Sequence, residues 1–265
     1  MEKRFSIIIS AYNIEEYIKR AIDSVLEQTF TNYELIIVND ASTDSTGKLI
    51  SEYNNITYIE HKENKCLGGA RNTAMDVAKG EYVIYLDGDD YLNNKEVLSK
   101  IDKLIDTQKP DIVYLGFEIT GTKQDIVIPQ KSNCNKMNRI AKDKYANVWS
   151  KCWNREFLEK YNLRFPENRY YEDVMFICKA IMRSETYLVA DFPTHTYVKG
   201  RPNSITTNVT MKNIHDTLYN LQELLDLMQN EEGENKEYLK QRIKRETKRC
   251  KERIDEIKVL MQINQ

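Results

Sequence analysis

The sequence lacks the cysteine patterns that would indicate a disulfide framework or a zinc site. Its five cysteines are scattered over 265 residues, with no CxxC pair and no Cys/His cluster. Free thiols in a reducing compartment are the plain interpretation, which favours a cytoplasmic location. No apolar run approaches the length of about 18 residues that a membrane span requires, and the run in "MEKRFSIIIS" is too short for a signal peptide.

The glycine-rich fingerprints of nucleotide binding are absent as well. No G-x-G-x-x-G follows the first predicted strand, and no G-x-x-x-x-G-K-[ST] occurs anywhere. The formal net charge of −2 also differs from that of a generic nucleic-acid binder, whose affinity rests on basic surface. Dinucleotide-binding, P-loop and nucleic-acid-binding functions therefore lose support.

What the sequence does contain is a regular alternation of strands and helices. Apolar, strand-like runs occupy residues 4–10, 33–40, 56–61 and 81–87, and amphipathic or small-residue helical segments separate them. This order predicts an α/β fold with a mostly parallel sheet and helices on both faces. Further on, we expect a strand at 111–119, helices at 154–162 and 172–184, a strand at 186–191 and two closing helices. The polar segment 120–147 has no clear pattern.

Polar clusters follow the first four predicted strands. They are "SAYN" (10–13), "NDAS" (39–42), "HKEN" (61–64) and "DGDD" (87–90). A solvated turn would explain any one of them. Because parallel strands bring their carboxyl ends to one edge of the sheet, where ligands bind, the repetition favours a ligand site.

The "DGDD" cluster has the chemistry of a divalent-cation site. A nucleotide bound without a glycine-rich cradle needs another group to neutralise its diphosphate. Mg²⁺ or Mn²⁺ held by one or two carboxylates does this. Asp87, Asp89 and Asp90 supply carboxylates, and Gly88 lets the backbone approach closely.

Taken in order, three segments resemble family-2 glycosyltransferases of the GT-A fold. They are "FSIIISAYNIEEYIKRAIDSVLEQTFTNYELIIVNDASTDST", "ENKCLGGARN" and "AKGEYVIYLDGDD". The resemblance is continuous over residues 4–92. A weaker one, through "WSKCWNREFLEKYNLRFPENRYYEDVMF", is to the acceptor half of bacterial polysaccharide transferases. Together the two resemblances imply a catalytic domain at residues 1–210 with a mostly parallel, Rossmann-like sheet. Its first part (1–92) would bind the nucleotide sugar, and its second part (93–210) would bind the acceptor. A C-terminal helical extension follows at 211–265.

The resemblance implies roles for residues of the donor half. Ala11 and Tyr12 would flank the nucleobase, with Tyr12 stacking on it. Asp40 would accept a hydrogen bond from the uracil N–H, which favours UDP-sugars. Arg71 would face the diphosphate, the alternative being an ion pair with a surface carboxylate.

The resemblance also implies which residues would bind a metal ion. Asp89 would be the main ligand of Mn²⁺ or Mg²⁺, and Asp87 would hold the metal or the ribose. Asp90 is either a helix cap or a ligand. His195 would complete the shell, although a lone histidine before a strand is more often structural. A basic, serine-containing loop would close over the diphosphate, and its candidate residues are Lys199, Arg201 and Ser204.

The second carboxylate pair, in "YYEDVMF", lies in the acceptor half. Neighbours on a helix point about 100° apart, so Glu172 and Asp173 cannot share one role. In the resembling family the Asp is the general base of an inverting transfer, and Glu172 would orient or cap. The alternative is an acidic pair that complements the helix dipole. Trp149 and Tyr171 are candidates for acceptor binding, or for core packing.

One position departs from the family pattern. Family members usually carry glycine two residues after the asparagine of the "EN" motif, where this chain has Cys66. Because glycine readily adopts positive φ, we expect this loop to take a different path.

The extension is predicted to form two amphipathic helices. The first has an apolar stripe made of Ile214, Leu218, Leu221, Leu225 and Met228, and the second has one made of Leu239, Ile243, Cys250, Ile254, Ile257 and Met261. The stripes could pack back on the catalytic domain, pair with another subunit, or place a basic helix on an anionic membrane.

The resemblance therefore implies an inverting, metal-dependent transferase that moves a sugar from a UDP-sugar to a hydroxyl of a glycan or lipid-linked acceptor. We expect it in bacterial surface polysaccharide synthesis, in the cytoplasm or peripherally on the inner face of the membrane. Two rivals are a sugar-phosphate nucleotidyltransferase, which should carry a glycine-rich basic loop after strand one, and a catalytically inactive nucleotide-sugar-binding module.

Overall fold

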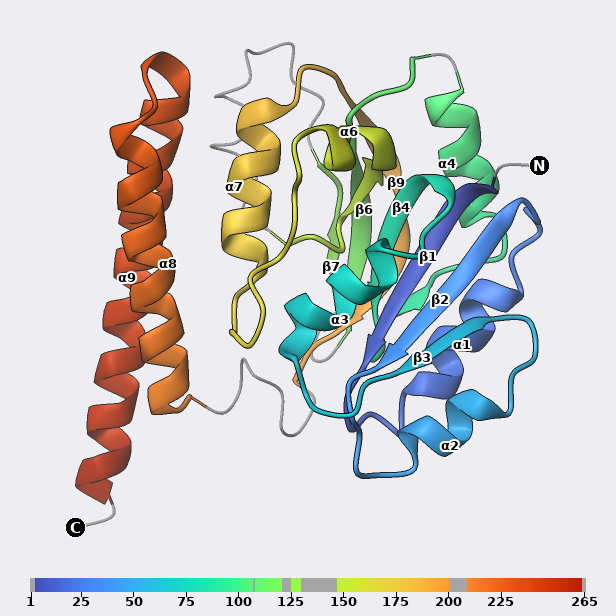
Figure 1. Ribbon diagram of the computed structural model, residues 1–265, viewed down its shortest axis with the longest axis horizontal. Coiled ribbons are helices and arrows are strands. Elements are labelled where there is room, and N and C mark those ends of the chain that lie inside the picture. Colours follow the sequence, from blue (N-terminus) through green and yellow to red (C-terminus); the bar gives the residue numbers. More distant parts are fainter. Residues whose placement is uncertain (1–2, 107, 121–124, 130–146, 201–208, 264–265) are drawn as a thin grey trace.

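The first four strands form the parallel part of the sheet, as the alternating pattern predicts. A computed structural model describes residues 3–106, 108–120, 125–129, 147–200 and 209–263. The strands are β1 (Lys3–Ala11), β2 (Tyr33–Asn39), β3 (Thr57–Glu60) and β4 (Gly80–Asp87). β1 pairs in parallel with β2 and β4, and β2 pairs in parallel with β3. Helices α1 (Ile18–Leu26), α2 (Thr46–Ser51) and α3 (Cys66–Met75) connect them (Figure 1).

The second half extends the same sheet through an antiparallel strand. The elements are β5 (Tyr91–Leu92), α4 (Val97–Ile105), β6 (Ile112–Thr120), β7 (Asp125–Val127), β8 (Lys151–Asn154), α6 (Arg155–Lys160), α7 (Asp173–Arg183) and β9 (Tyr187–Val198). β8 lies antiparallel between β4 and β6, giving the order β3-β2-β1-β4-β8-β6-β9-β5, with β7 beside β6. The predicted fold class, a mostly parallel α/β sheet flanked by helices, is confirmed, although the sequence pattern missed β8.

Hydrophobic cores cover both faces of the sheet. Ile7 and Ile9 of β1 pack with α1 and α4, whereas Ile8 between them packs with α3, α6 and α7. Successive strand residues point to opposite faces, so a continuous apolar run such as "SIIIS" marks a strand buried on both sides. This double cover makes the rim of the sheet, rather than its faces, the accessible place for a site.

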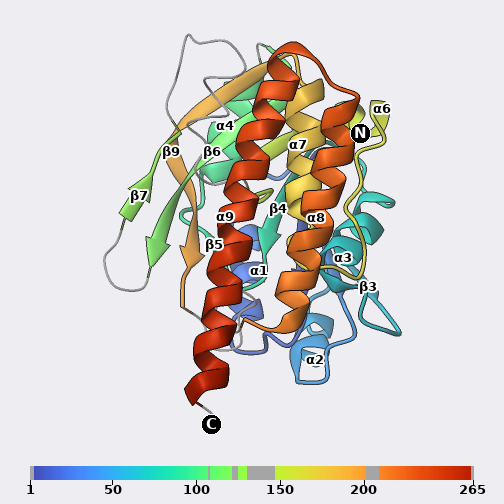
Figure 2. The ribbon, with the colours of Figure 1, turned by 90° about the vertical axis from the view of Figure 1, so that its left-hand side faces the viewer.

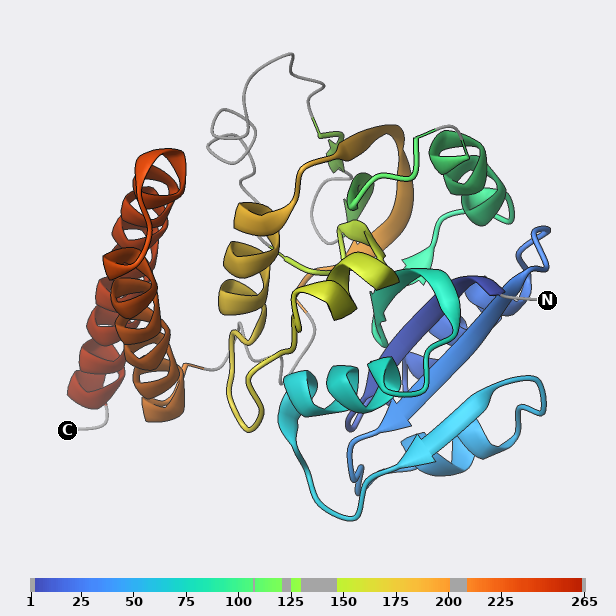
Figure 3. The same cartoon turned by 45° about the horizontal axis from the view of Figure 1, so that its top comes forward.

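The C-terminal helices, α8 (Met211–Gln229) and α9 (Gly233–Ile263), form an antiparallel hairpin beside α7 (Figures 1 and 2). Leu224, Tyr238 and Leu239 are buried in the same core as α7, so the hairpin packs back on the catalytic fold. Figure 3 shows the hairpin on the side of the sheet away from β3. No described helix is both long and apolar enough to cross a membrane.

The predicted apolar stripe of α8 is buried only in part: Ile214 is buried and Met228 packs against the core. Leu218 and Leu225 are 51% and 40% exposed, and the buried face carries mostly polar side chains instead. The buried residues of α8 are Asn213, Ile214, Asp216, Thr217, Asn220 and Leu224. The polar ones are buried because several of them form hydrogen bonds with the loop that precedes α7.

Candidate active site

The carboxyl ends of β1, β2 and β4 meet at one rim of the sheet. Ala11 is paired with Asn39, and Ser10 with Asp87, so the predicted clusters are neighbours in space. The backbone N–H of Asp40 donates to the Ala11 carbonyl at 2.8 Å. Ala11 is buried, whereas the side chain that follows it, Tyr12, is 48% exposed at the rim.

Asp40 is buried at this rim and is held by two donors on one carboxylate oxygen. His61 Nδ1 lies 2.6 Å from Asp40 Oδ1, and the Lys65 backbone N–H donates to the same oxygen at 2.9 Å. Oδ2 makes no hydrogen bond to any described residue. Sequence reasoning missed His61, and the only signal was its place in the "HKEN" cluster. The carboxylate is fixed in position with one oxygen left for a ligand.

The three carboxylates of "DGDD" form a cluster. Oxygen atoms of Asp87, Asp89 and Asp90 all lie within 4.8 Å of one another. Asp90 is 1% exposed; its Oδ1 accepts from the Val198 N–H at 2.8 Å, and its buried Oδ2 has no hydrogen bond within the described ranges. Burial, and then the charges of Asp87 and Asp89, raise the pKa of Asp90 well above its ordinary value. Because Asp90 bonds to β9 and α4 begins only at Val97, the helix-cap reading of Asp90 is wrong.

This donor set fits a divalent cation. It offers only hard carboxylate oxygens, crowded together, one of them buried without a partner. Mg²⁺ and Mn²⁺ prefer such ligands, and a cation would relieve the repulsion between them.

Gly88 allows the acidic turn to pack against the end of β1. A Cβ at this position would lie 2.3 Å from Ile14 Cδ1 and 3.1 Å from the Ser10 carbonyl oxygen. A side chain here would displace the tip of Ile14 and press on the Ser10 carbonyl, so glycine favours the close approach that the sequence suggested.

Arg71 joins the acidic cluster to the second carboxylate pair. Its side chain is 3% exposed; Nη2 lies 2.8 Å from Asp87 Oδ1 and Nη1 lies 2.5 Å from Glu172 Oε1. The guanidinium thus bridges two motifs that are 85 residues apart in sequence (172 − 87 = 85). Arg71 is buried at the rim rather than paired on the surface, and its place facing a diphosphate stays a prediction.

Glu172 and Asp173 have different surroundings. Glu172 is 5% exposed and is held by Arg71, and burial raises its pKa to about 7. Asp173, the first residue of α7, is half-buried, and its carboxylate makes no hydrogen bond or ion pair with another described residue. Burial raises the pKa of Asp173, while the charges of Arg242 and Arg71 oppose the increase. The Glu172 side chain makes no cap hydrogen bond to α7.

The remaining predicted residues lie in other surroundings. His195, 2% exposed, stacks on Phe117 and meets the edge of Trp149, and its Nδ1 lies 2.9 Å from Thr194 Oγ1. It is outside the acidic cluster, so the described geometry favours a structural role over the predicted metal ligand. Burial lowers its pKa to about 3. Trp149 is likewise buried in this aromatic group, which makes it core rather than acceptor surface.

The predicted basic loop is described only at its start. Lys199 is exposed just after β9, and Arg201 and Ser204 lie outside the described residues. Tyr171 is half-buried beside Glu172, and its hydroxyl accepts from Asn213 Nδ2 at 2.6 Å.

Cys66 overturns the expectation for its loop. Its φ is 59°, the left-handed conformation that glycine favours, so the loop keeps the positive φ despite the side chain. Local hydrogen bonds hold this conformation: Asn64 Oδ1 accepts from the Cys66 N–H, and Asn64 Nδ2 donates to the Asp40 carbonyl.

A mostly parallel α/β sheet carries an acidic turn, the buried carboxylate of Asp40 and a second carboxylate pair at one rim, as expected for an enzyme of the glycosyltransferase class. The chain belongs to glycosyl transferase family 2, whose family model matches residues 6–181.

Curated relatives come from bacteria. The chain is 31% identical over 216 residues to the uncharacterized glycosyltransferase EpsJ of Bacillus subtilis, covering 76% of this chain and 62% of EpsJ, so it spans about three fifths of that relative. It is 32% identical over 209 residues to WfaP of Escherichia coli, a UDP-Glc:alpha-D-GlcNAc-diphosphoundecaprenol beta-1,3-glucosyltransferase, covering 77% of this chain and 80% of WfaP.

A solved structure shares the fold. The crystal structure of Staphylococcus aureus TarS 1–349 in complex with UDP-GlcNAc superposes with a TM-score of 0.74 at 23% identity, covering 91% of this chain and 70% of that chain. The superposed part of this chain reaches beyond the family match, which ends at residue 181.

Proposed function

We propose that this protein transfers a sugar from a UDP-sugar to a hydroxyl of a glycan or lipid-linked acceptor in bacterial surface polysaccharide synthesis. The names of two similar proteins support the donor: WfaP is described as using UDP-Glc, and the TarS structure contains UDP-GlcNAc. The acceptor named for WfaP is a diphosphoundecaprenol-linked sugar, which supports a lipid-linked acceptor here.

The observation that carries the proposal is the bridge from Asp87 through Arg71 to Glu172. It joins a cation-binding cluster to a carboxylate pair across a rim that also holds Asp40. A donor diphosphate and an acceptor hydroxyl need these two kinds of group close together.

The donor half would bind and orient the nucleotide. The Asp40 Oδ2 atom would accept the uracil N–H, and the exposed ring of Tyr12 would stack on the base. Asp87 and Asp89, with Asp90 behind them, would hold Mn²⁺ or Mg²⁺. When bound, the ion supplies positive charge that stabilises the departing diphosphate.

The acceptor half would supply the base. Asp173 would take the proton of the acceptor hydroxyl as that oxygen forms a bond to the anomeric carbon, while the bond from that carbon to the UDP oxygen breaks. Attack opposite the leaving group inverts the configuration. Glu172, held by Arg71, would keep Asp173 in position relative to the bound donor.

A panel of nucleotide sugars tests this function. UDP-, GDP- and CMP-sugars, each with Mn²⁺, Mg²⁺ or EDTA, are assayed by thermal shift and by nucleotide release. We expect UDP and UDP-sugars to stabilise the fold only with a divalent ion, by about 2.7 kcal/mol at a hundredfold excess over Kd. Equal stabilisation in EDTA would refute the metal site, and preference for a GDP- or CMP-sugar would refute the role of Asp40. Binding without turnover on any acceptor would favour the inactive module.

The cytoplasmic location, and contact of the C-terminal helices with a membrane or a second subunit, stay predictions. The exposed Leu218 and Leu225 on α8 are available for either contact.

A further inference from the structure

The loop 168–172, which leads into the proposed base, has a strained backbone. Asn168 has a φ of 59° and Tyr171 a φ of 60°, both in the left-handed region. Asparagine tolerates this region, whereas a bulky side chain such as tyrosine is unfavourable there, so the strain lies mainly at Tyr171. Such conformations persist only where the surroundings determine them, and they concentrate at functional sites.

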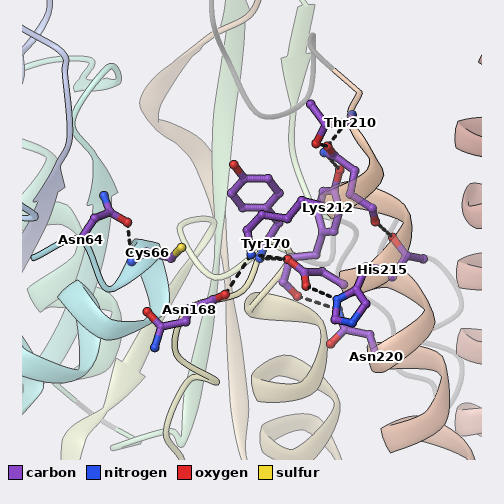
Figure 4. A network of polar contacts seen from close by, with 12 residues as sticks. Asn64, Cys66, Asn168, Tyr170, Thr210, Lys212, His215 and Asn220 are labelled. Carbon is purple, nitrogen blue, oxygen red and sulfur yellow. Dashed lines mark hydrogen bonds and ion pairs between the residues drawn. The ribbon is translucent and has the colours of Figure 1, made fainter. Parts of the chain in front are cut away.

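Helix α8 supplies those surroundings through a row of hydrogen bonds (Figure 4). Four of its side chains reach the loop, and we call them the clamp face: Lys212, Asn213, Asp216 and Asn220. Lys212 Nζ donates to the Asn168 carbonyl at 2.9 Å, and Asp216 Oδ2 accepts the Tyr170 N–H at 2.9 Å. Asn220 Nδ2 donates to the Tyr171 carbonyl at 3.0 Å, and Asn213 Nδ2 donates to the Tyr171 hydroxyl at 2.6 Å.

The clamp face differs from an ordinary packed helix face because its buried residues are polar. Asn213, Asp216 and Asn220 are exposed by only 0%, 2% and 1%. A helix that packs only for stability buries apolar side chains, because a buried polar group stabilises little unless it is bonded. Here exposed leucines alternate with buried amides, and two of the three buried polar residues bond Tyr171 itself.

Helix α9 reinforces the same place. The Arg253 guanidinium lies 3.8 Å from the centre of the Tyr171 ring and donates to Thr217 Oγ1 of α8. Arg242, 3% exposed, pairs with the buried Glu246 at 3.0 Å. Burial raises the pKa of Asp173; the charge of Arg242 opposes this increase most strongly, whereas the charge of Glu246 adds to it, so α9 places charges of both signs near the carboxylate.

The opposite side of the loop rests on the donor half. The Asn168 N–H donates to the Lys65 carbonyl at 3.0 Å, and Lys65 N–H in turn bonds Asp40. A Cβ on Gly68 of α3 would lie 2.2 Å from the Pro166 carbonyl oxygen, so the chain leading into the loop touches α3 directly. The loop is therefore wedged between the donor-binding rim and α8.

We propose that the C-terminal hairpin is a positioning element of the active site: its clamp face holds the strained 168–172 loop, and through it Glu172 and Asp173, against the donor half. The effect that we expect on kcat rests on the proposed function. It assigns no contact with substrate to α8, so the clamp residues position the base rather than take part in the chemistry.

Two variants of α8 in the full chain separate positioning from stability. Asn220→Ala removes a hydrogen bond to the loop. Leu224→Ala, one turn further along the helix, removes buried apolar volume from the core and touches no hydrogen bond of the loop. Large-to-small changes of buried leucine are strongly destabilising, so Leu224→Ala should show the lower Tm. Both proteins are assayed below their unfolding transitions with the UDP-sugar that the wild type uses.

We expect Asn220→Ala to lower kcat about 10- to 100-fold with donor KM within about twofold, because a displacement near 1 Å is enough to misplace a reacting group. Leu224→Ala should keep kcat within about twofold despite its lower Tm. Amide hydrogen exchange over residues 168–174 should be faster in Asn220→Ala than in Leu224→Ala.

The positioning role is refuted if the variant with the lower Tm also has the lower kcat. It is also refuted if Asn220→Ala leaves both kcat and amide exchange of the loop unchanged. A wild-type chain that transfers no sugar refutes the proposed function instead. In that case hydrogen exchange alone decides the clamp: faster exchange in Asn220→Ala supports it, and equal exchange in the two variants refutes it.

Discussion

Replacing Arg71 with methionine would keep the length of the side chain and remove the charge that Asp87 and Glu172 share. The side chains of Arg71 and Glu172 are 3% and 6% exposed and that of Asp87 is 24% exposed, so breaking the ion pairs would leave an unpaired charge buried at Glu172. Removing one partner of a buried pair typically costs about 3–5 kcal/mol. We expect a loss in this range from urea denaturation at pH 8. The loss should be smaller at pH 5.5, where Glu172, with its raised pKa, takes up a proton and no longer needs a cation.

Arg4 provides a matched control at the opposite end of the sheet. It pairs with Glu81 at 2.5 Å and Asp102 at 2.7 Å, and more distantly with Asp106 at 3.8 Å, but these side chains are 34%, 30% and 77% exposed. Arg4→Met should lose only about 1–2 kcal/mol, because solvent screens exposed pairs, and should leave UDP binding unchanged. An Arg71→Met loss below about 1 kcal/mol, or one equal to that of Arg4→Met, would contradict the bridge as described.

Three further predictions follow from the same rim. Cys66→Gly should raise the free energy of unfolding by up to about 1 kcal/mol, because it relieves the positive φ, and a destabilised variant in denaturant titration would contradict this. The pKa of Glu172 rises from 4.5 to about 7 on folding, so the native state binds the proton more tightly; the unfolding free energy should therefore fall as pH increases between these values, and Glu172→Gln should flatten that dependence. If the unfolding free energy of Glu172→Gln depends on pH as steeply as that of the wild type, another group causes the dependence. Asp89→Ala should abolish sugar transfer and metal-dependent UDP binding while the circular dichroism spectrum stays native; an unfolded variant would make Asp89 structural.

The parallel half of the sheet and its rim could be predicted because local patterns encode them. A run such as "SIIIS" identifies a strand buried on both faces, and polar residues directly after it must lie at the strand's carboxyl end. Parallel pairing then brings Asp40 and Asp87 to one edge without knowledge of any distant contact.

Contacts between distant segments could not be predicted in the same way. The partner of Arg71 lies 101 residues away at Glu172, and nothing in either local pattern specifies the pairing. The polar part of the buried face of α8 could not be predicted, because leucines at helical spacing normally mark the core, whereas here Asn213 and Asn220 are buried and bond Tyr171. His61 was missed because its function is to hold Asp40, which no spacing rule expresses.

The proton-acceptor role of Asp173 is the part of the account on which transfer depends most directly. The measurement that tests it is the turnover number of Asp173→Asn beside its affinity for UDP, with Glu172→Gln in parallel. The amide keeps the shape of the side chain but accepts no proton, so kcat should fall by about 10²- to 10⁴-fold while the UDP Kd is unchanged. Glu172→Gln should be less impaired, since the proposed role of its carboxylate, held by Arg71, is to orient rather than to react. A nearly active Asp173→Asn beside an inactive Glu172→Gln would reverse the two roles, and two active variants would remove this pair from the mechanism.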